Sequence, residues 1–96
     1  MESEKIRANV KINGDPIPFV LAPSDEPYFR EAAKKINDKL AELQNKYGSL
    51  ASSEMLLSTI AVEAMVDALQ VHENYERLKA ELSGRLEQID ERLSRN

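Results

Sequence analysis

The sequence contains no cysteine and no tryptophan, and its 96 residues include only three glycines and four prolines. Without cysteine the chain cannot form disulfides, thiol nucleophiles or cysteine-ligated metal sites. The three glycines are isolated from one another, so no glycine-rich loop is available to hold a phosphate group. These absences exclude several common classes of enzyme and metalloprotein, and we expect no metal site and no cofactor.

Acidic residues outnumber basic ones, and aromatic residues are few. The net charge is −4 and aromatic residues make up 5% of the chain. Binding to nucleic acid depends mainly on Lys and Arg that neutralise phosphates, so we expect no nucleic-acid partner. The polar first residues carry no apolar signal core, and no apolar run approaches the ~20 residues that cross a bilayer. We therefore expect a soluble, cytoplasmic protein without membrane contact.

Candidate catalytic groups are few. They are the single histidine, His72, and the carboxylate pairs Asp25-Glu26 and Asp90-Glu91. No acid, hydroxyl or second ligand is organised around His72, and both carboxylate pairs fall at solvated helix ends. We expect a protein that is not an enzyme and has no catalytic residues.

What the sequence does contain is one long apolar stripe, and no proline follows Pro27. The stripe runs through Leu57, Ile60, Ala64, Ala68, Val71, Tyr75, Leu78, Leu82, Leu86, Ile89 and Leu93. Spacings of three and four residues predict a single helix from about Ser52 to about Arg95, roughly 65 Å long. A compact domain of this chain length has a radius of gyration of only about 13 Å. We therefore expect the helix to leave its own domain and to pair with other copies.

The two halves of this predicted helix differ. Residues 55–71 are apolar nearly all round, which predicts burial on several sides, with Met55 and Met65 as core residues and a second subunit against them. After His72 a single apolar seam remains. Its flanking acid-first pairs are Glu73 with Arg77 and Glu81 with Arg85. The predicted oligomer interface consists of Ile60, Ala64, Val71, Tyr75, Leu78, Leu82, Leu86, Ile89 and Leu93.

The first twenty-two residues predict a β-hairpin. Apolar and polar residues alternate over residues 5–13 and again over 17–21, with Asn13-Gly14 as a tight turn between them. Pro16 and Pro18 cannot donate ladder hydrogen bonds, which indicates an edge strand. A lone hairpin is marginal in water, so its apolar face is expected to lie on helices.

A first helix follows. We predict Ser24 as its N-cap, Pro27 in its first turn and Gly48 as its C′ residue. Its predicted i,i+4 ion pairs are Glu31 with Lys35, Lys34 with Asp38, and Glu42 with Lys46. Ser52 is the predicted cap of the long helix.

The expected fold class is α+β. Residues 1–51 form a head from the hairpin and the first helix, completed by the start of the second helix. Residues 52–96 form the long helix, with its first half in a dimer core and its second half as a coiled-coil tail. The stretch before Ser52 is too short to bury much of a core alone, which also favours oligomerisation.

Two surface features are candidates for binding. Lys5, Arg7 and Lys11 share the outward face of the first strand, where they either only solvate the sheet or dock an acidic partner. Glu54 lies at the start of the long helix, where it either compensates the helix dipole or contacts a partner.

Taken together, three stretches resemble the ZapA family of bacterial cell-division proteins. They are Val10-Lys11-Ile12-Asn13-Gly14, the segment from Tyr28 to Leu40 with sequence YFREAAKKINDKL, and the helix start Ser52-Ser53-Glu54. The similarity covers almost the whole chain. It implies a homodimer with a globular head, and two dimers joined antiparallel through their long helices into a dumbbell-shaped homotetramer. It also implies binding to FtsZ, the tubulin-like GTPase, and cross-linking of FtsZ filaments at the mid-cell division ring.

The resemblance also suggests partner-binding residues. Members of the family often carry a basic residue directly after the turn glycine, in the region that contacts the filament, and here that residue is Asp15. The expected contact therefore shifts toward Lys11, Lys46 and Glu54, with Lys5 on the same strand face as Lys11. Asn37 and Leu40 follow the family pattern in the first helix, where the expected role is structural.

Two other interpretations stay open at this point. A generic coiled-coil oligomerisation or adaptor module would share the long stripe, and failure to co-sediment with polymerised FtsZ would favour it. A small DNA-binding regulator could also combine a hairpin with helices. Such a regulator would show salt-sensitive binding to duplex DNA in a gel shift.

Overall fold

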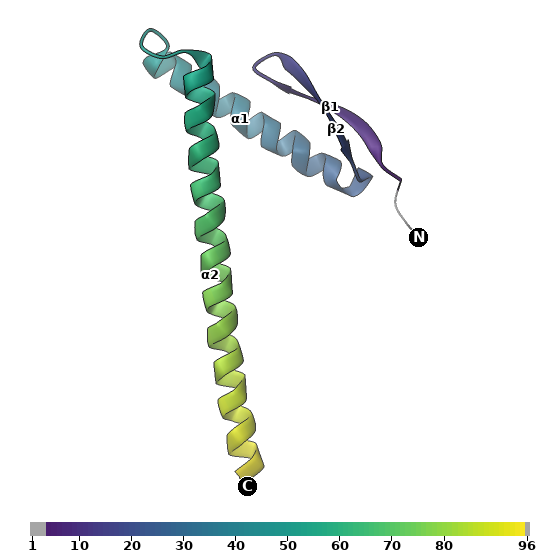
Figure 1. Ribbon diagram of the computed structural model, residues 1–96, viewed down its shortest axis with the longest axis vertical. Helices are drawn as coiled ribbons and strands as arrows, with labels where there is room; N and C mark the ends of the chain where they lie inside the picture. Colours follow the sequence, from purple (N-terminus) through teal and green to yellow (C-terminus); the bar gives the residue numbers. More distant parts are fainter. Residues whose placement is uncertain (1–3, 96) are drawn as a thin grey trace. The chain divides into compact units, whose positions relative to one another are not determined.

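The computed structural model describes residues 4–95 and confirms the α+β class. A β-hairpin of β1 (Ile6–Ile12) and β2 (Asp15–Leu21) leads through the short 3-10 turn η1 (Pro23–Asp25) into α1 (Glu26–Tyr47) and α2 (Ser53–Arg95) (Figure 1). The chain divides after Ala61 into two compact units. We call the unit up to Ala61 the head and the remainder of α2, from Val62, the tail.

The hairpin forms as the alternation predicts. Its strands pair antiparallel from Ile6 opposite Leu21 to Ile12 opposite Asp15. Asn13 and Gly14 form the turn, both with positive φ, 53° and 82°. This is the two-residue primed turn whose twist matches that of the strands. The buried members of the inward face are Ala8, Val10 and Leu21.

The outer edge of β2 is poor in hydrogen-bond donors. Pro16 lies opposite Lys11 and Pro18 opposite Asn9. Antiparallel pairs alternate between those that exchange hydrogen bonds and those whose backbone groups point away from the partner strand. Because proline has no N–H, these two pairs are of the second kind, and the ladder between the strands loses nothing.

The outer edge of β1 is tied to α1 by side chains. The Asn37 amide donates to the Lys11 carbonyl at 2.9 Å and accepts from the Asn13 backbone N–H, also at 2.9 Å. Arg30 Nη1 donates to the Asn9 carbonyl at 2.7 Å. These bonds fix the hairpin on the helix and give Asn37 the structural role expected from its position.

The start of α1 differs from the prediction. Ser24 is not the N-cap, because Pro23 begins a 3-10 turn in which the Asp25 N–H bonds to the Ala22 carbonyl at 2.9 Å. The N-cap of α1 is Asp25, and its side chain makes no capping bond. The chain therefore enters the helix through a tighter helical turn and needs no extended cap residue.

The end of α1 also differs. Gly48 is the C-cap, with a right-handed φ of −61°, so the prediction that Gly48 is the C′ residue is wrong. Its N–H continues the helical pattern to the Gln44 carbonyl at 2.8 Å, and Leu50 N–H closes the next turn on Tyr47 O at 2.8 Å. The three predicted ion pairs of α1 are present, together with Glu26–Arg30 and Lys39–Glu42.

A second small core joins the end of α1 to the start of α2. Leu40, Leu56 and Ile60 are buried together, and Ile36, Leu43, Ala51 and Leu57 pack around them. Ser52 caps α2 as predicted, since its Oγ accepts the Met55 N–H at 3.1 Å. These contacts account for the stability of the turn between the two helices.

Beyond Ile60 every described residue of α2 is exposed in the single chain. Met55 and Met65 are 60% and 61% exposed, so the chain alone does not place them in a core. Neither predicted tail ion pair forms within residues 4–95; Arg77 instead donates to Asn74 Oδ1 at 2.9 Å. Solvated pairs contribute only about 0–1 kcal/mol, so a nearby amide competes easily.

Candidate functional site

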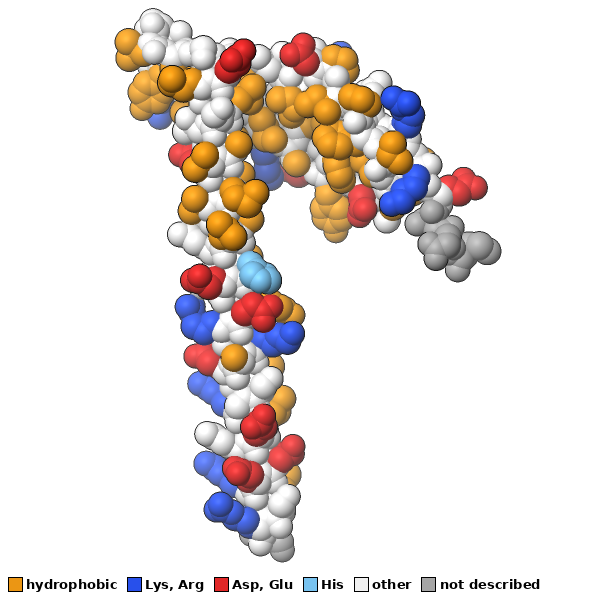
Figure 2. Space-filling view, in the orientation of Figure 1, with side chains coloured by type: hydrophobic (Ala, Val, Ile, Leu, Met, Phe, Trp, Pro, Cys, Tyr) orange, Lys and Arg blue, Asp and Glu red, His pale blue; other side chains and the backbone are white. Residues whose placement is uncertain are grey.

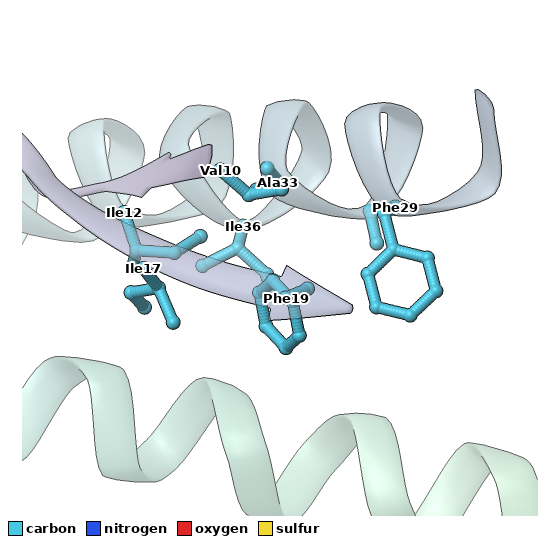
Figure 3. A pocket seen from close by; sticks show the side chains of 8 residues that line it. Val10, Ile12, Ile17, Phe19, Phe29, Ala33 and Ile36 are labelled. Carbon is cyan, nitrogen blue, oxygen red and sulfur yellow. The ribbon is translucent and has the colours of Figure 1, made fainter. Parts of the chain in front are cut away.

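An apolar hollow opens between the hairpin and the first half of α1. It has a volume of about 360 Å³. The side chains that line it are Val10, Ile12, Ile17, Phe19, Phe29, Ala32, Ala33 and Ile36. Residues of β1, β2 and α1 all point into it (Figure 3). Phe19 and Phe29 meet edge to face, with ring centroids 5.0 Å apart, and their contact joins β2 to α1.

The apolar residues near the start of α2 fall on two separate faces of the helix. At about 100° per residue, Leu56 and Leu57 lie near Ile60, on the face that packs against α1. A second group lies at roughly 140–240° from Ile60, and we call it the outer face. It consists of Val62, Met65, Val66 and Leu69, which are between 43% and 64% exposed.

The outer face was missed from the sequence. The predicted interface followed only the stripe through Ile60, although the segment was recognised as apolar nearly all round. The structure assigns Ile60 to the core within the chain, whereas Ala64 is exposed. Once Ile60 is known to pack on α1, the angular position of each residue around the helix axis identifies the outer face.

The tail carries a third apolar surface, the tail seam. It consists of Val71, Tyr75, Leu78, Leu82, Leu86, Ile89 and Leu93, each between 48% and 68% exposed. Val71, Leu82 and Leu93 are spaced by eleven residues, close to the natural period of the α-helix, so the seam stays nearly parallel to the helix axis. Figure 2 shows many charged side chains along the C-terminal half of α2 and mostly hydrophobic side chains along its first half.

Five residues were predicted to bind a partner, and all five are exposed. Lys11 and Asp15 lie near the tip of the hairpin, beside the turn that Asn37 holds. Lys5 is six residues before Lys11, a separation of about 20 Å along an extended strand. Lys5, Arg7 and Lys11, which we call the basic stripe, are therefore spread along the strand and do not form a compact cluster.

The other two residues flank the turn between α1 and α2. Lys46 is in the last turn of α1, with its Nζ 3.9 Å from Glu42, and Glu54 is in the first turn of α2. A hydrogen bond of 3.0 Å from Gln44 to Ser53 holds these two helix ends together. The same turn carries Leu50, which is 83% exposed.

One pair of charged side chains on α1, Lys34 and Asp38, interacts closely enough to change a pKa. The hydrogen bond from Lys34 to Asp38, 3.0 Å long, raises the pKa of Lys34, with a further contribution from the charge of Asp38. Both side chains are exposed. Among residues 4–95 no three His, Asp or Glu side chains are grouped so that they could hold a metal ion. The pair of Lys34 and Asp38 is a solvated ion pair on the surface of α1.

By length and composition alone, α2 could also cross a membrane. An 18-residue window of the helix reaches a mean hydropathy of 1.2, and only 11% of it is buried in the chain. Glu63 and Asp67 interrupt the apolar part of this helix, so the sequence still has no uninterrupted apolar run of the ~20 residues that cross a bilayer. The core helix of an oligomer passes the same test, because it is apolar on several sides.

These features define a small α+β protein, in which a hairpin-and-helix head precedes a long helix whose apolar faces are exposed in the single chain. The family model described as Cell division protein ZapA matches residues 8–93. The chain belongs to the ZapA family, a non-enzymatic family of cell-division proteins associated with FtsZ. Comparison with curated proteins and with solved structures gave no match.

Proposed function

We propose that this protein binds FtsZ filaments at the cytoplasmic division ring and cross-links them as a homo-oligomer with two or more heads. The observation that carries the proposal is the tail seam, an apolar surface that the chain leaves uncovered over several turns. Burial of one large aliphatic side chain contributes about 1.5–3 kcal/mol. Several such side chains together exceed the lower estimates of the cost of association, about 4 kcal/mol.

Antiparallel pairing of two tails would separate the heads. The 43 residues of α2 make a rod of about 65 Å, so helices paired in this way hold their heads at opposite ends. Once one head is bound, the second binds at a raised effective concentration, which multiplies a weak contact into useful avidity. Such a protein acts through spacing and needs no catalysis.

Two carboxylates favour a bundle of helices over a membrane span. Glu63 and Asp67 lie within the most apolar part of α2 and are exposed in the chain. An acidic side chain at the centre of a bilayer costs about 2.5–3.5 kcal/mol on insertion scales. In a bundle the same side chains can remain in water at the rim of the interface. A second copy of the chain is therefore a better partner for the apolar part of α2 than a lipid bilayer.

For the filament contact we propose the basic stripe of Lys5, Arg7 and Lys11. These side chains carry positive charge on the head of a chain whose net charge is −4. Electrostatic complementarity with an acidic surface would guide the encounter and fix its orientation. The alternative contact is Leu50 in the turn between α1 and α2, together with Lys46 and Glu54, which flank that turn. Asp15 would mark the border of the basic stripe.

The test is co-sedimentation with FtsZ polymerised by GTP, combined with light scattering to measure bundling. We expect bundling by the native protein that weakens as salt is raised, because exposed charge pairs are screened over ~8 Å at physiological ionic strength. The double variant Lys5→Ser/Lys11→Ser should keep its oligomer mass and melting temperature but lose bundling.

A matched control removes two lysines elsewhere. Lys34→Ser/Lys35→Ser changes the net charge equally on the exposed side of α1, and should leave bundling intact. Equal bundling by both double variants would reject the basic stripe and favour the turn near Leu50. No co-sedimentation by the native protein would reject the FtsZ function and leave a generic oligomerisation module.

A further inference from the structure

We propose that the outward face of the hairpin is a docking surface for an amphipathic helix whose polar side is acidic. This face carries two rows of exposed side chains. The basic stripe of β1 is one row, and the other, which we call the apolar row, consists of Pro16, Pro18 and Val20 of β2. The inference rests on the proposed function in assigning the helix to FtsZ, and it adds an apolar contact to the electrostatic one.

The pairing of the strands places the two rows side by side. Arg7 lies opposite Val20 in the ladder. Lys11 lies opposite Pro16, so the apolar row runs beside the positive charges for about 13 Å. Val20 is 69% exposed, and within residues 4–95 neither Arg7 nor Lys11 takes part in an ion pair. Both rows are therefore available to a partner.

The edges of the hairpin favour a helix over an extended segment. On the edge of β1, the carbonyls of Asn9 and Lys11 already accept hydrogen bonds from α1 side chains, at 2.7 and 2.9 Å. The edge of β2 lacks the N–H donors of its two prolines. An extended segment would therefore have no complete ladder to join, whereas a helix satisfies its own backbone hydrogen bonds.

The apolar row is rigid before any partner binds. Proline loses no rotamer freedom on burial, and valine has a restricted χ1, so covering the row costs little conformational entropy. On a helix lying along the strands, apolar side chains spaced three and four residues apart would cover this row. Acidic side chains on the adjoining side of the same helix would then reach the basic stripe, which matches its charge.

The composition of this face favours a protein partner over lipid or nucleic acid. Binding at a lipid interface uses bulky side chains such as Trp, Phe or Leu, and the outward positions within residues 6–20 carry none of them. A phosphate backbone would use the charges of the basic stripe but would leave the apolar row without an apolar partner.

The test is a co-sedimentation titration with FtsZ filaments at several salt concentrations. Pro18→Thr/Val20→Thr removes apolar surface but keeps residues that suit a strand. We expect about tenfold weaker binding with an unchanged salt dependence, because no charge is lost. Lys5→Ser/Lys11→Ser should instead flatten the salt dependence. Leu50→Thr, at an 83% exposed position outside the hairpin, is the matched control and should bind like the native protein.

A second variant distinguishes the apolar contact from charge alone. Val20→Lys adds a positive charge opposite Arg7. Docking by charge alone would make this variant bind an acidic surface more tightly, whereas loss of the apolar contact predicts binding several-fold weaker than native. Melting temperature and oligomer mass are measured for every variant, and affinities are compared among those that keep both.

The outcomes separate this inference from the proposed function. Native affinity in the double threonine variant, or tighter binding by Val20→Lys, would overturn the apolar contact and leave the FtsZ function standing. Weaker binding by Leu50→Thr alone would also overturn it. Sedimentation of the native protein with phosphatidylglycerol vesicles, lost in the double threonine variant, would assign the face to lipid instead. No binding of the native protein to FtsZ would reject the proposed function and this inference with it.

Discussion

The head and the tail contain the same kinds of residue, but their side chains make different kinds of contact. In the head, side chains from distant parts of the sequence meet, as when Asn37 binds the turn at Asn13 and Leu40 packs on Leu56. In the described part of the tail, the one side-chain hydrogen bond joins Arg77 to Asn74, three residues earlier. The sequence therefore encodes a tertiary fold in the head and leaves a row of apolar side chains uncovered in the tail.

This difference predicts where substitutions act. A small head buries little of its surface and is marginally stable, so each buried contact has a large share in its free energy of unfolding. In the tail the apolar side chains are exposed in the single chain, so changes there should act on the association of copies. The predictions below test that separation.

The largest effect on stability is expected from Leu40→Ala. Leu40 is 3% exposed at the centre of the cluster with Leu56 and Ile60. Truncation of a buried leucine costs about 2–5 kcal/mol, which should lower the urea midpoint strongly or unfold the head. The control is Leu50→Ala at an 83% exposed position, which should shift stability by no more than about 0.5 kcal/mol. Equal shifts for both variants would disprove the proposed location of the core.

A smaller effect is expected from Asn37→Ala. This change removes the two bonds to the hairpin and leaves the Lys11 carbonyl and the Asn13 N–H without these partners. Water reaches both groups, so the expected cost is about 1–2 kcal/mol, measured by urea unfolding, with faster amide exchange in the hairpin. Asn45→Ala, on the exposed last turns of α1, is the control and should be neutral. Unchanged exchange in Asn37→Ala would show that the hairpin does not depend on this contact.

The two glycines Gly14 and Gly84 should respond in opposite directions. At both positions an added Cβ would meet no atom within 4 Å apart from the adjacent residues and, at Gly84, the backbone of its own helix, so only the backbone conformation matters. Gly14 has a φ of +82°, and Gly14→Ala should cost about 1–2 kcal/mol. Gly84 is inside a regular helix, and Gly84→Ala should stabilise the tail by about 1 kcal/mol. Thermal unfolding followed by circular dichroism measures both, and a loss of stability in both would contradict the contrast.

Local patterns predicted much of the fold. The hairpin, its turn, the Ser52 cap and the ion pairs of α1 all follow from residues close together in the sequence. The predicted capping residues at both ends of α1 were wrong, because Pro23 begins a 3-10 turn and Gly48 is a right-handed C-cap. Both outcomes depend on the path of the chain between elements, which spacing alone does not contain.

The surfaces were harder to predict than the elements. The hollow arises because α1 lies against the edge of β1, through Arg30 and Asn37, and leaves part of the inward face open. Alternation identified that face as apolar but not that it would stay uncovered. The outer face of α2 likewise emerged only when Ile60 was found packed within the chain.

The most direct test of the separation between head and tail is Leu82→Glu. Leu82 lies at the middle of the tail seam and is 60% exposed in the single chain. A carboxylate buried between paired tails would cost several kcal/mol, which dissociation avoids by returning it to water. The neighbouring variant Ser83→Glu, outside the seam, is the control.

The decisive measurement combines mass by light scattering with FtsZ co-sedimentation and bundling on Leu82→Glu. We predict a smaller oligomer whose head still melts as in the native protein and still binds FtsZ, but which no longer bundles filaments. An unchanged mass, or full bundling by the smaller oligomer, would contradict the claim that the tail cross-links by joining copies.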